Sequence, residues 1–337
     1  MTIREQIEKR EQEILSPYAC LSINSRGRQK EEAQCDIRPV FQRDRDRILH
    51  SKSFRRLKNK TQVFLTPKGD HYRTRMSHTL EVSQNARTIA KALRMNEDLV
   101  EAIALGHDLG HTPFGHAGEF ILDEIYEGGF KHNEQSVRIV DKLEKDGEGL
   151  NLTWEVRDGI LNHQTKLMPS TLEGKIVRFS DKIAYINSDF DDAIRAQLVC
   201  EEDIPLEIRK ELGFDTRTRL DHMIHNIIIN SADKNDIMMS KETAEAMKEL
   251  RVFMFENVYK NPIAKSEEAK AKAMLEQLYY YYMDHIDELP EKLLSMLDQG
   301  EDKGRVICDY ISGMTDQYAI KKFHDYFIPV AWEIDGY

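Results

Sequence analysis

The sequence predicts an all-α protein with at most a short β-hairpin near residues 62–73. Its 337 residues include only 17 glycines and 9 prolines, which is too few for a turn-rich β architecture. Apolar residues also recur at helical spacing along most of the chain. With 40% apolar and 32% charged residues, the composition is that of a folded protein with a sizeable core.

The first of three expected regions, residues 1–44, is an N-terminal arm and irregular segment. Seven of its first 15 residues are charged, and we expect a helix there. The stretch from Ser16 to Pro39 shows no regular apolar period, and we expect it to be irregular. Neither part has the size of an independent domain.

The second region, residues 45–200, should form the helical core of the molecule. Ile48, Phe54 and Leu57 have the spacing of an apolar face, which predicts a helix between Gln42 and Lys60. A Pro-Lys-Gly turn follows this helix and predicts the short hairpin.

Three more helices are expected to complete the core. An apolar stripe with Leu80 and Ile89 predicts the first, and Asn96 has the side chain of an N-cap for the second. The third should cover about residues 173–198. The last region, residues 201–337, contains further apolar-periodic segments and should pack on the core as a C-terminal helical region.

The cysteines and the hydropathy argue against several classes of protein. No apolar stretch approaches the roughly 20 residues of a membrane-spanning helix, and the N-terminus lacks the apolar core of a signal peptide. The cysteines are scattered without a Cys-x-x-Cys pair, which disfavours a zinc ribbon and a disulfide framework. These are Cys20, Cys35, Cys200 and Cys308. We therefore expect a cytoplasmic protein with reduced thiols and no membrane partner.

Charge is distributed unevenly along the chain. The formal net charge is −11, yet residues 26–75 hold 15 lysines and arginines against 6 acidic residues. Such a basic segment on an acidic protein could receive a polyanion, either a phosphate chain or a single-stranded nucleic acid. The alternative is a solvated helix face, because basic and acidic residues alternate from Arg43 to Arg47 and partly neutralise one another.

The richest stretch for chemistry runs from Gly106 to His116 and contains three histidines. His107 continues the apolar stripe of its helix, so its ring should point inward, beside Asp108. A divalent cation would explain a buried imidazole next to a carboxylate, although a hydrogen-bonded pair at a helix end is the alternative. His78 and Asp181 lie on neighbouring predicted helices and could supply further ligands.

The helix that carries Asp181 has an unusual polar face. Asp181, Tyr185 and Asp189 recur every four residues and so share one side of the helix, while isoleucines occupy the other side. This stripe either lines a polar site or is exposed to solvent. Asn162 and His163 are interpreted as structural or supporting residues rather than as ligands.

The order His78, His107-Asp108, Asp181 resembles the pattern of the HD superfamily of metalloproteins. Most of the chain is similar to the HD-domain deoxynucleoside triphosphate (dNTP) triphosphohydrolase family, especially to its shorter bacterial deoxyguanosinetriphosphate triphosphohydrolase-like members. The segments that carry the resemblance are Arg45–Leu57, Lys60–Phe64, Arg73–His78, His107–His116, Gly129–Asn133, Asp181–Tyr185 and Asp309–Asp316.

The resemblance implies an HD-domain helical bundle that hydrolyses dNTPs, dGTP among them, to deoxynucleoside and inorganic triphosphate. It implies one divalent ion per site, Mn²⁺ or Mg²⁺ first and Fe²⁺ or Zn²⁺ as alternatives. The ligands would be His78, His107, Asp108 and Asp181. The family also assembles into homo-oligomers, so a tetramer or hexamer is expected, and a dNTP could act as an allosteric activator.

The resemblance also assigns catalytic and substrate-binding residues. The catalytic residues would be His111, His116, Glu119 and His132, with Glu119 in place of the aspartate of some members. Phosphate contacts would come from Arg75 and Lys182. The sugar and base contacts would come from Tyr185, which excludes a 2′-hydroxyl, and from Asp189, Gln62, Asp316 and Tyr318.

Two other functions compete with this interpretation. One is a different HD-superfamily phosphohydrolase, acting on a cyclic nucleotide or an alarmone. The other is a non-catalytic regulator that binds dNTPs or single-stranded nucleic acid. The products of the reaction distinguish all three, because only a triphosphohydrolase releases intact triphosphate.

Overall fold

The computed structural model describes residues 1–63, 65 and 71–329, with the backbone alone over 263–266. Every regular element in these ranges is helical, which confirms the predicted all-α class. Thr61 and Thr74 form an isolated antiparallel bridge where the hairpin was expected. The rest of that hairpin, residues 64 and 66–70, lies outside the described residues.

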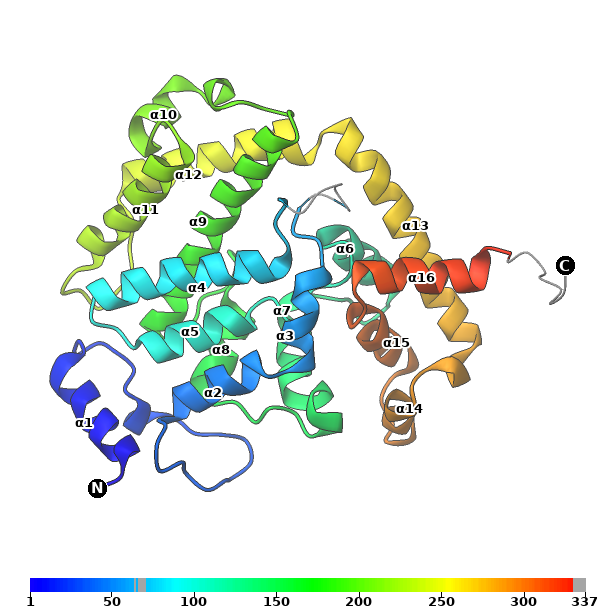
Figure 1. Cartoon of the computed structure of the whole chain (residues 1–337), viewed down its shortest axis with the longest axis horizontal. Helices are drawn as coiled ribbons and strands as arrows, with labels where there is room; N and C mark the ends of the chain where they lie inside the picture. Colours follow the sequence, from blue (N-terminus) through cyan, green and yellow to red (C-terminus); the bar gives the residue numbers. More distant parts are fainter. Residues whose placement is uncertain (64, 66–70, 330–337) are drawn as a thin grey trace, which may run out of the picture.

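Helices α4, α5, α8 and α9 lie together in the middle of the fold, α1 lies at its edge, and α13–α16 form the opposite side (Figure 1). The first nine are α1 (Ile3–Ile14), α2 (Val40–Leu49), α3 (Lys52–Arg56), α4 (Arg75–Ala92), α5 (Glu97–Gly106), α6 (His116–Ile125), α7 (His132–Arg138), α8 (Trp154–Asn162) and α9 (Leu172–Arg195). The others are α10 (Leu206–Leu212), α11 (Thr216–Ser231), α12 (Lys241–Met254), α13 (Pro262–Asp284), α14 (Glu291–Asp298), α15 (Lys303–Ser312) and α16 (Asp316–Phe327).

Helices α4, α5 and α9 pack against one another and carry the residues expected to bind metal. Asn96 caps α5 as predicted, since its side chain accepts a hydrogen bond from Leu99 N at 3.2 Å. The apolar stripe of α4 was predicted incorrectly at Leu80, which is 51% exposed, whereas Ile89 is fully buried. The inner face of α4 is instead partly polar, because Arg75 and His78 are buried on it.

The single helix predicted over residues 42–60 is two helices. The helix is interrupted at Ser51. The Ser51 hydroxyl accepts a hydrogen bond from Phe54 N at 3.1 Å and so caps α3. A short 3₁₀ turn, η2 (Leu57–Asn59), continues α3 toward Lys60. The break redirects the chain, and the buried Lys60 then lies against His111 and Ser312.

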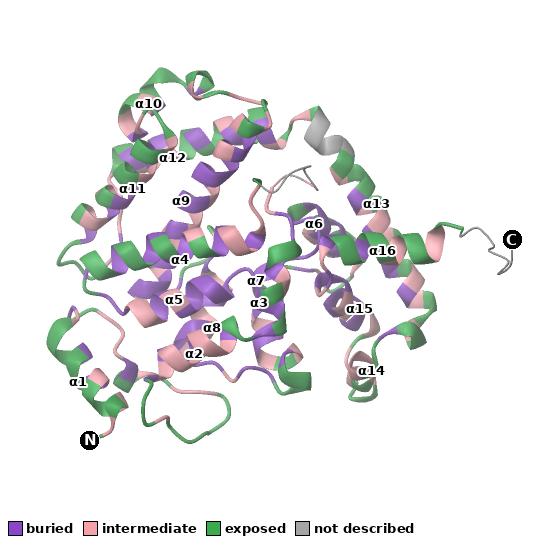
Figure 2. Cartoon of the chain, viewed as in Figure 1, coloured by how far each residue is buried: buried purple, intermediate pink, exposed green. Residues whose placement is uncertain are grey.

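Two apolar clusters hold the described structure together, and Figure 2 shows buried residues in both. The larger one joins α2, α4, α5, α8, α9 and α10–α12. The smaller one joins α6 to α13, α15 and α16. Helix α6 therefore packs on the C-terminal helices although it lies early in the sequence. The boundaries 1–44, 45–200 and 201–337 remain a prediction.

A buried ion pair attaches the irregular segment before Pro39 to the core. Arg28 pairs with Asp44, which also accepts hydrogen bonds from Thr153 N and Oγ1 at 2.8 and 2.6 Å. Asp44 is fully buried, so loss of Arg28 would leave a buried charge without its partner. No helix among the described residues combines the length and hydropathy needed to cross a membrane.

Candidate metal centre

Three helices bring four predicted ligands to one place. His78 comes from the first turn of α4, His107 and Asp108 follow the end of α5, and Asp181 lies in α9. His78 Nε2 is 3.1 Å from Asp181 Oδ1. His107 Nε2 is 3.4 Å from Asp108 Oδ1 and 3.8 Å from Asp181 Oδ1. The structure thus places two imidazole nitrogens and two carboxylates around a common point.

The hydrogen bonds of His107 show that this arrangement suits a cation. Its Nδ1 lies 2.6 Å from the carbonyl of Ala104, so Nδ1 carries the proton and Nε2 presents a lone pair. That Nε2 is buried without a hydrogen-bond partner and faces two carboxylates, neither of which donates a hydrogen bond when ionised. A divalent ion would satisfy all of these atoms, and the donor set is one that Mn²⁺, Fe²⁺ and Zn²⁺ accept.

Both carboxylates stay ionised in this environment. Burial favours a higher pKa for Asp108, but His107, His111 and Arg75 outweigh it and hold the pKa well below its usual range. Burial likewise opposes ionisation of Asp181, yet His78 and His107 keep its pKa at about 2. The pKa of His78 is raised because its contact with Asp181 outweighs its burial. Two ionised carboxylates therefore lie beside the histidines.

Arg75 holds the second oxygen of Asp108 and leaves its own Nε free. Its Nη1 donates to Asp108 Oδ2 at 2.8 Å, and its Nη2 reaches the carbonyl of Gln62 at 3.4 Å. The guanidinium is almost fully buried, and its Nε has no hydrogen-bond partner. The side-chain Oε1 of Gln62 is also buried without a partner. Both predicted substrate contacts thus present unpaired polar atoms.

The four predicted catalytic residues form a second, adjoining group. Glu119 joins His116 and His132: His116 Nδ1 lies 3.1 Å from Oε2, and His132 Nδ1 lies 2.9 Å from both oxygens. Burial favours a higher pKa for Glu119, but the neighbouring histidines outweigh it and lower the pKa strongly. The side chain of His116 is 76% exposed, whereas that of His132 is buried. His116 therefore presents its other nitrogen to solvent.

His111 connects the two groups. Its Nε2 lies 3.2 Å from Asp108 Oδ1, and its ring stacks on that of His132 with centroids 3.9 Å apart. Burial, together with Arg75 and His132, lowers the pKa of His111 well below its usual value, so this imidazole is neutral at pH 7. A neutral ring can stack on His132 and donate or accept one hydrogen bond.

A strained turn and the buried Asp316 fix the loop between His111 and α6. Phe114 and Gly115 have φ values of 61° and 56°, in the left-handed region. Asp316, at the start of α16, accepts from Phe114 N at 3.0 Å and from Thr61 N at 2.8 Å. The structure thus places this predicted substrate-binding carboxylate, buried, between two loops of the site.

Lys60 lies in a segment that resembles the family, but no role was predicted for it. It is buried and donates to the carbonyls of His111 and Ser312, the latter at 2.7 Å. Burial, with further contributions from Arg56 and Arg75, lowers its pKa to about 7. Its partners are distant in sequence, so local spacing could not predict that Lys60 is buried between two loops of the fold.

The polar stripe of α9 continues away from the metal ligands. Burial lowers the pKa of Lys182 to about 8 and raises that of Tyr185 to about 12. Asp189 is 5% exposed; its Oδ2 accepts from the hydroxyl of Tyr259 at 2.7 Å, while Oδ1 has no partner. Tyr259, from a π-helical turn 70 residues later, was not predicted. Asp189 therefore offers one free acceptor in a buried position.

Tyr318 lies apart from these buried groups. Its side chain is 41% exposed, on the first turn of α16, and its hydroxyl is 3.2 Å from that of Tyr310. A contact between Tyr318 and a nucleotide base remains a prediction.

His163 was interpreted as a structural or supporting residue, and it lies inside the histidine group. Its Nε2 is 3.2 Å from His132 Nε2, and its ring centroid is 5.0 Å from that of His107. Burial, together with His107 and His132, lowers its pKa to about 4. A histidine after Asn162 has no distinctive spacing, so the sequence did not show this contact.

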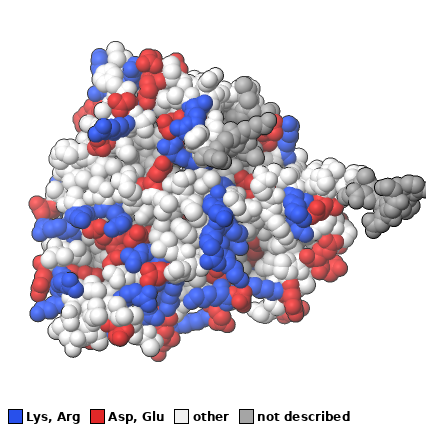
Figure 3. Space-filling model, in the orientation of Figure 1, with Lys and Arg blue, Asp and Glu red and all other residues white. Residues whose placement is uncertain are grey.

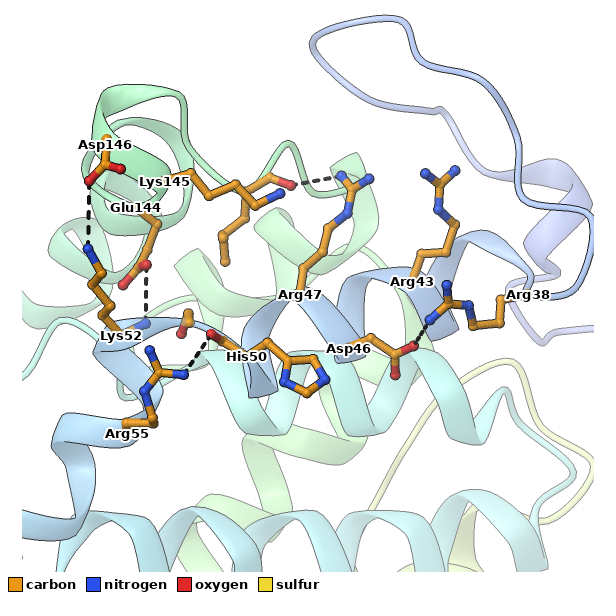
Figure 4. Close-up of a pocket in the computed structure, with 12 residues that line it drawn as sticks. Arg38, Arg43, Asp46, Arg47, His50, Lys52, Arg55, Glu144, Lys145 and Asp146 are labelled. Carbon is orange, nitrogen blue, oxygen red and sulfur yellow. Dashed lines mark hydrogen bonds and ion pairs between the residues drawn. The ribbon is translucent and has the colours of Figure 1, made fainter.

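A separate basic cleft of about 430 Å³ lies on α2, α3 and the 3₁₀ turn η4 (Lys145–Gly147) (Figure 4). Figure 3 shows Lys and Arg side chains gathered over α2 and α3. Six basic residues line the cleft against three acidic ones. Some are paired, such as Arg38 with Asp46 at 2.5 Å. In Figure 4, Arg43 and Arg47 extend from α2 on the same side. Both of these arginines also pair with Glu32, at 3.1 and 2.7 Å. The lining still contains more basic than acidic residues, which favours an anion.

Two family models match parts of this chain, and a solved structure shares its fold. Residues 75–186 match the HD domain, and residues 237–325 match the phosphohydrolase-associated domain. The first match begins at Arg75 and extends to residue 186, so it includes all four predicted metal ligands. A solved phosphohydrolase from Bacteroides thetaiotaomicron has a similar fold, with a TM-score of 0.53, 17% identity and coverage of 83% of this chain and 68% of its own.

Curated relatives match over almost the whole length. A deoxyguanosinetriphosphate triphosphohydrolase-like protein from Caldanaerobacter subterraneus is 57% identical over 98% of both chains. Proteins with the same name from Desulfatibacillum aliphaticivorans and Clostridium perfringens are each 48% identical over 98% of this chain, and the match covers 99% and 98% of their own lengths.

Proposed function

The chain belongs to the family of deoxyguanosinetriphosphate triphosphohydrolase-like proteins, and on that basis we propose that it hydrolyses dNTPs, dGTP among them, to deoxynucleoside and inorganic triphosphate. It is an HD-domain phosphohydrolase. The observation that carries the proposal is that partnerless polar atoms of Arg75 and Asp189 accompany the buried metal-ligand group. These atoms provide a donor for phosphate and an acceptor for a sugar hydroxyl.

His78, His107, Asp108 and Asp181 would hold one divalent ion, Mn²⁺ or Mg²⁺ first and Fe²⁺ or Zn²⁺ as alternatives. Such an ion supplies Lewis acidity, which makes water a better nucleophile and offsets negative charge on phosphate. The chain itself contributes the geometry. Arg75 fixes the orientation of Asp108, and Ala104 fixes the tautomer of His107.

Hydrolysis forms a bond between the water oxygen and the α-phosphorus and breaks the bond from that phosphorus to the 5′-oxygen. One proton must reach the departing 5′-oxygen. His116 suits this role because its free nitrogen is exposed while Glu119 holds the other one. Glu119 also contacts His132, so the three side chains form a relay that can hold or pass a proton. His111, neutral and buried, can donate a hydrogen bond to a phosphate oxygen.

Substrate recognition would use the polar stripe of α9. Lys182, with Arg75, would bind phosphate oxygens. Tyr185 would pack on the deoxyribose and exclude a 2′-hydroxyl, and the free Oδ1 of Asp189 would accept from the 3′-hydroxyl. Gln62, whose Oε1 lacks a partner, would contact the sugar or base. We also propose that Asp316 and Tyr318 contact the base.

We further propose a cytoplasmic homo-oligomer, tetramer or hexamer, that accepts a dNTP as activator. The unpaired state of all four cysteines supports a reducing compartment. The basic cleft offers the activator a phosphate-binding surface outside the metal ligands, and single-stranded nucleic acid is an alternative occupant. Native mass spectrometry with and without dNTP would measure both the oligomer and the bound nucleotide.

Product analysis tests the proposed activity. We would incubate the full chain with Mn²⁺ and each dNTP, alone and in pairs, and separate the products by anion exchange. Deoxynucleoside with intact triphosphate is expected, and turnover found only in mixtures would indicate an activator. Monophosphate products would favour another phosphohydrolase, acting on cyclic nucleotides or alarmones. If a dNTP binds but no divalent metal ion that is tested supports product formation, a non-catalytic regulator would be favoured.

A matched pair of variants ties the activity to the metal ligands. His107→Ala should abolish turnover and keep the helical circular-dichroism spectrum, because one ligand is lost from a site that the surrounding helices hold in place. His324→Ala, at an exposed position of α16, should leave turnover unchanged. Turnover by His107→Ala would contradict the proposed metal centre.

A further inference from the structure

The buried side chain of Lys60 joins two segments that are far apart in sequence. Lys60 is 2% exposed, and its Nζ donates to the carbonyl oxygens of His111 and Ser312, the latter at 2.7 Å. Both partners are uncharged backbone groups, whereas a buried ammonium is usually paired with a carboxylate. An apolar side chain would fill this space without the cost of burying a charge. The two hydrogen bonds therefore indicate the task of Lys60.

Ser312 supplies a carbonyl that its own helix leaves unpaired. It is the last residue of α15, and the final four carbonyls of a helix have no partner within the helix. The partial negative charge at this end of a helix also favours a cation. Ser312 is fully buried, so water does not take the place of Lys60 there. The end of α15 thus gives Lys60 a fixed attachment.

The other hydrogen bond of Lys60 holds the loop that carries His111. The Nε2 atom of His111 lies 3.2 Å from Asp108 Oδ1, and its ring centroid lies 3.9 Å from that of His132. Its Nδ1 is buried without a hydrogen-bond partner. Because the ring is carried by its own backbone, a shift of the His111 carbonyl moves the ring relative to both neighbours.

The backbone around Lys60 is fixed to the same part of the molecule. Lys60 O accepts from Arg75 N at 3.1 Å, where α4 begins. The next residue, Thr61, donates its N–H to Asp316 Oδ2 at 2.8 Å, and Asp316 Oδ1 accepts from Phe114 N at 3.0 Å. The length of the Lys60 side chain therefore sets the distance between the end of α15 and the His111 loop.

We propose that Lys60 is a positioning residue, which holds the His111 loop against the end of α15 and so places the His111 ring between Asp108 and His132. This inference rests on the proposed function, in which His111 contacts a phosphate oxygen of the substrate. Lys60 acts through His111 and does not itself contact the substrate. A displacement of about 1 Å at a group that contacts the reacting phosphate can cost on the order of 100-fold in rate.

Two substitutions of Lys60 test the hydrogen bonds. Lys60→Met keeps an unbranched side chain of similar length and removes both bonds. It should lower kcat by on the order of 10- to 100-fold and change KM by less than about 3-fold, because Arg75, Lys182 and Asp189 remain. Lys60→Gln is shorter but keeps N–H donors, so its kcat should lie between those of Lys60→Met and the wild type. It also tests the proposal if Lys60→Met does not fold.

Two control variants separate positioning from a general loss of stability. Ile227→Ala removes buried apolar contacts of α11, and it should unfold at lower denaturant concentration while keeping the wild-type kcat under folding conditions. Lys30→Met removes another bond from a lysine to a carbonyl, from Nζ to Glu148 O at 3.0 Å in an exposed place, and should leave kcat and KM unchanged. A wild-type kcat in every Lys60 variant that folds would overturn the proposal.

Crystal structures of the same variants without substrate give a result that does not depend on activity. The centroids of His111 and His132 should move apart by about 1 Å in Lys60→Met and by less in Lys60→Gln. Centroids that stay 3.9 Å apart in each folded variant would overturn the proposal. If the ring moves but the wild type releases no triphosphate, the positioning role of Lys60 stands and only the proposed function fails.

Discussion

At the scale of single residues, the site is marked by buried polar atoms without partners in the chain. His107 Nε2, Arg75 Nε and Asp189 Oδ1 are three of these atoms. Each such atom costs about 1–3 kcal/mol if nothing satisfies it. Their grouping near the metal ligands and along the α9 stripe indicates that ligands, rather than further packing, complete this part of the molecule.

Asp189 gives a prediction for stability as a function of pH. Burial first, and nearby Asp192 as a smaller cause, raise its pKa from 3.8 to about 6. The folded state thus holds this proton more tightly than the unfolded chain, and the protein loses stability as pH rises from about 4 to about 6. A shift of about two units corresponds to about 3 kcal/mol.

The Asp189→Asn variant has no charged form at this position. Relative to wild type, it should unfold at higher denaturant concentration at pH 8, with a difference of up to about 3 kcal/mol that disappears near pH 4. Urea unfolding at several pH values measures this difference. Asp233→Asn, at an exposed position, should give a flat difference. A flat difference for Asp189→Asn would show that its carboxylate carries no penalty in the fold.

Tyr185 gives a prediction for substrate choice. If its ring excludes a 2′-hydroxyl, Tyr185→Ala should narrow the preference for dNTP over the matching ribonucleotide by on the order of 10- to 100-fold in kcat/KM. Tyr185→Phe keeps the ring and should keep the preference. An unchanged ratio in the alanine variant would assign sugar discrimination to another residue.

At the scale of elements, one glycine sets the distance between α7 and the turn after α5. A Cβ at Gly110 would lie 2.3 Å from His132 O and from Ser136 N, which are both backbone atoms. Gly110→Ala must therefore displace α7 and, with it, His132. We expect a loss of about 3 kcal/mol in unfolding free energy and at least a 10-fold loss of turnover.

Gly313→Ala is the matched control for that change. A Cβ at Gly313, at the end of α15, would lie 3.2 Å from the carbonyl of Asp309, which is farther than the 2.3 Å found at Gly110. It should change both quantities much less than Gly110→Ala. Equal effects of the two variants, measured by urea unfolding and by a turnover assay, would contradict the close approach at Gly110.

The elements also show what local sequence could predict. The cap at Asn96 and the long helix α9 follow from side-chain chemistry and apolar period within a few residues. The break at Ser51 was missed because an apolar stripe continued across it, although a serine is a good N-cap. Leu80 was assigned to the buried side because the site makes the true inner face of α4 polar.

Site residues that belong to a sequence motif could be predicted. Site residues that are brought together only by the fold could not. His78, His107, Asp108 and Asp181 stand in a recognisable order, and they come together. Tyr259 beside Asp189 and His163 beside His132 join residues 70 and 31 positions apart. No local spacing encodes such contacts, because the packing of helices far apart in sequence creates them.

At the scale of the whole molecule, two of the residues proposed to be catalytic depend on the C-terminal helices. Helix α6 carries His116 and Glu119 and packs on α13. A Cβ at Gly118 of α6 would lie 3.0 Å from the side chain of Leu275, so the two helices are in close contact there. The C-terminal cluster therefore positions α6 while the larger cluster positions α4, α5 and α9.

Because different apolar clusters position α6 and the helices α4, α5 and α9, substitutions in the two clusters should affect turnover differently. Leu275→Ala, at a fully buried position of α13, should cost about 2–5 kcal/mol and also lower kcat, because α6 loses its support. Ile227→Ala in α11, equally buried in the larger cluster, should cost a similar amount with kcat retained below its unfolding temperature. Equal kcat values in both variants would show that α6 does not need α13.

The central claim is that a metal-dependent reaction occurs at the α-phosphorus. Hydrolysis in H₂¹⁸O tests it most directly, because the product that carries the ¹⁸O shows which atom the water attacked. The Mn²⁺-loaded chain would hydrolyse a dNTP in labelled water, and mass spectrometry would locate the ¹⁸O. Label in the triphosphate and none in the deoxynucleoside is the predicted result, with no reaction after chelation. Label in the deoxynucleoside, or labelled monophosphate with pyrophosphate, would contradict the assignment of this site.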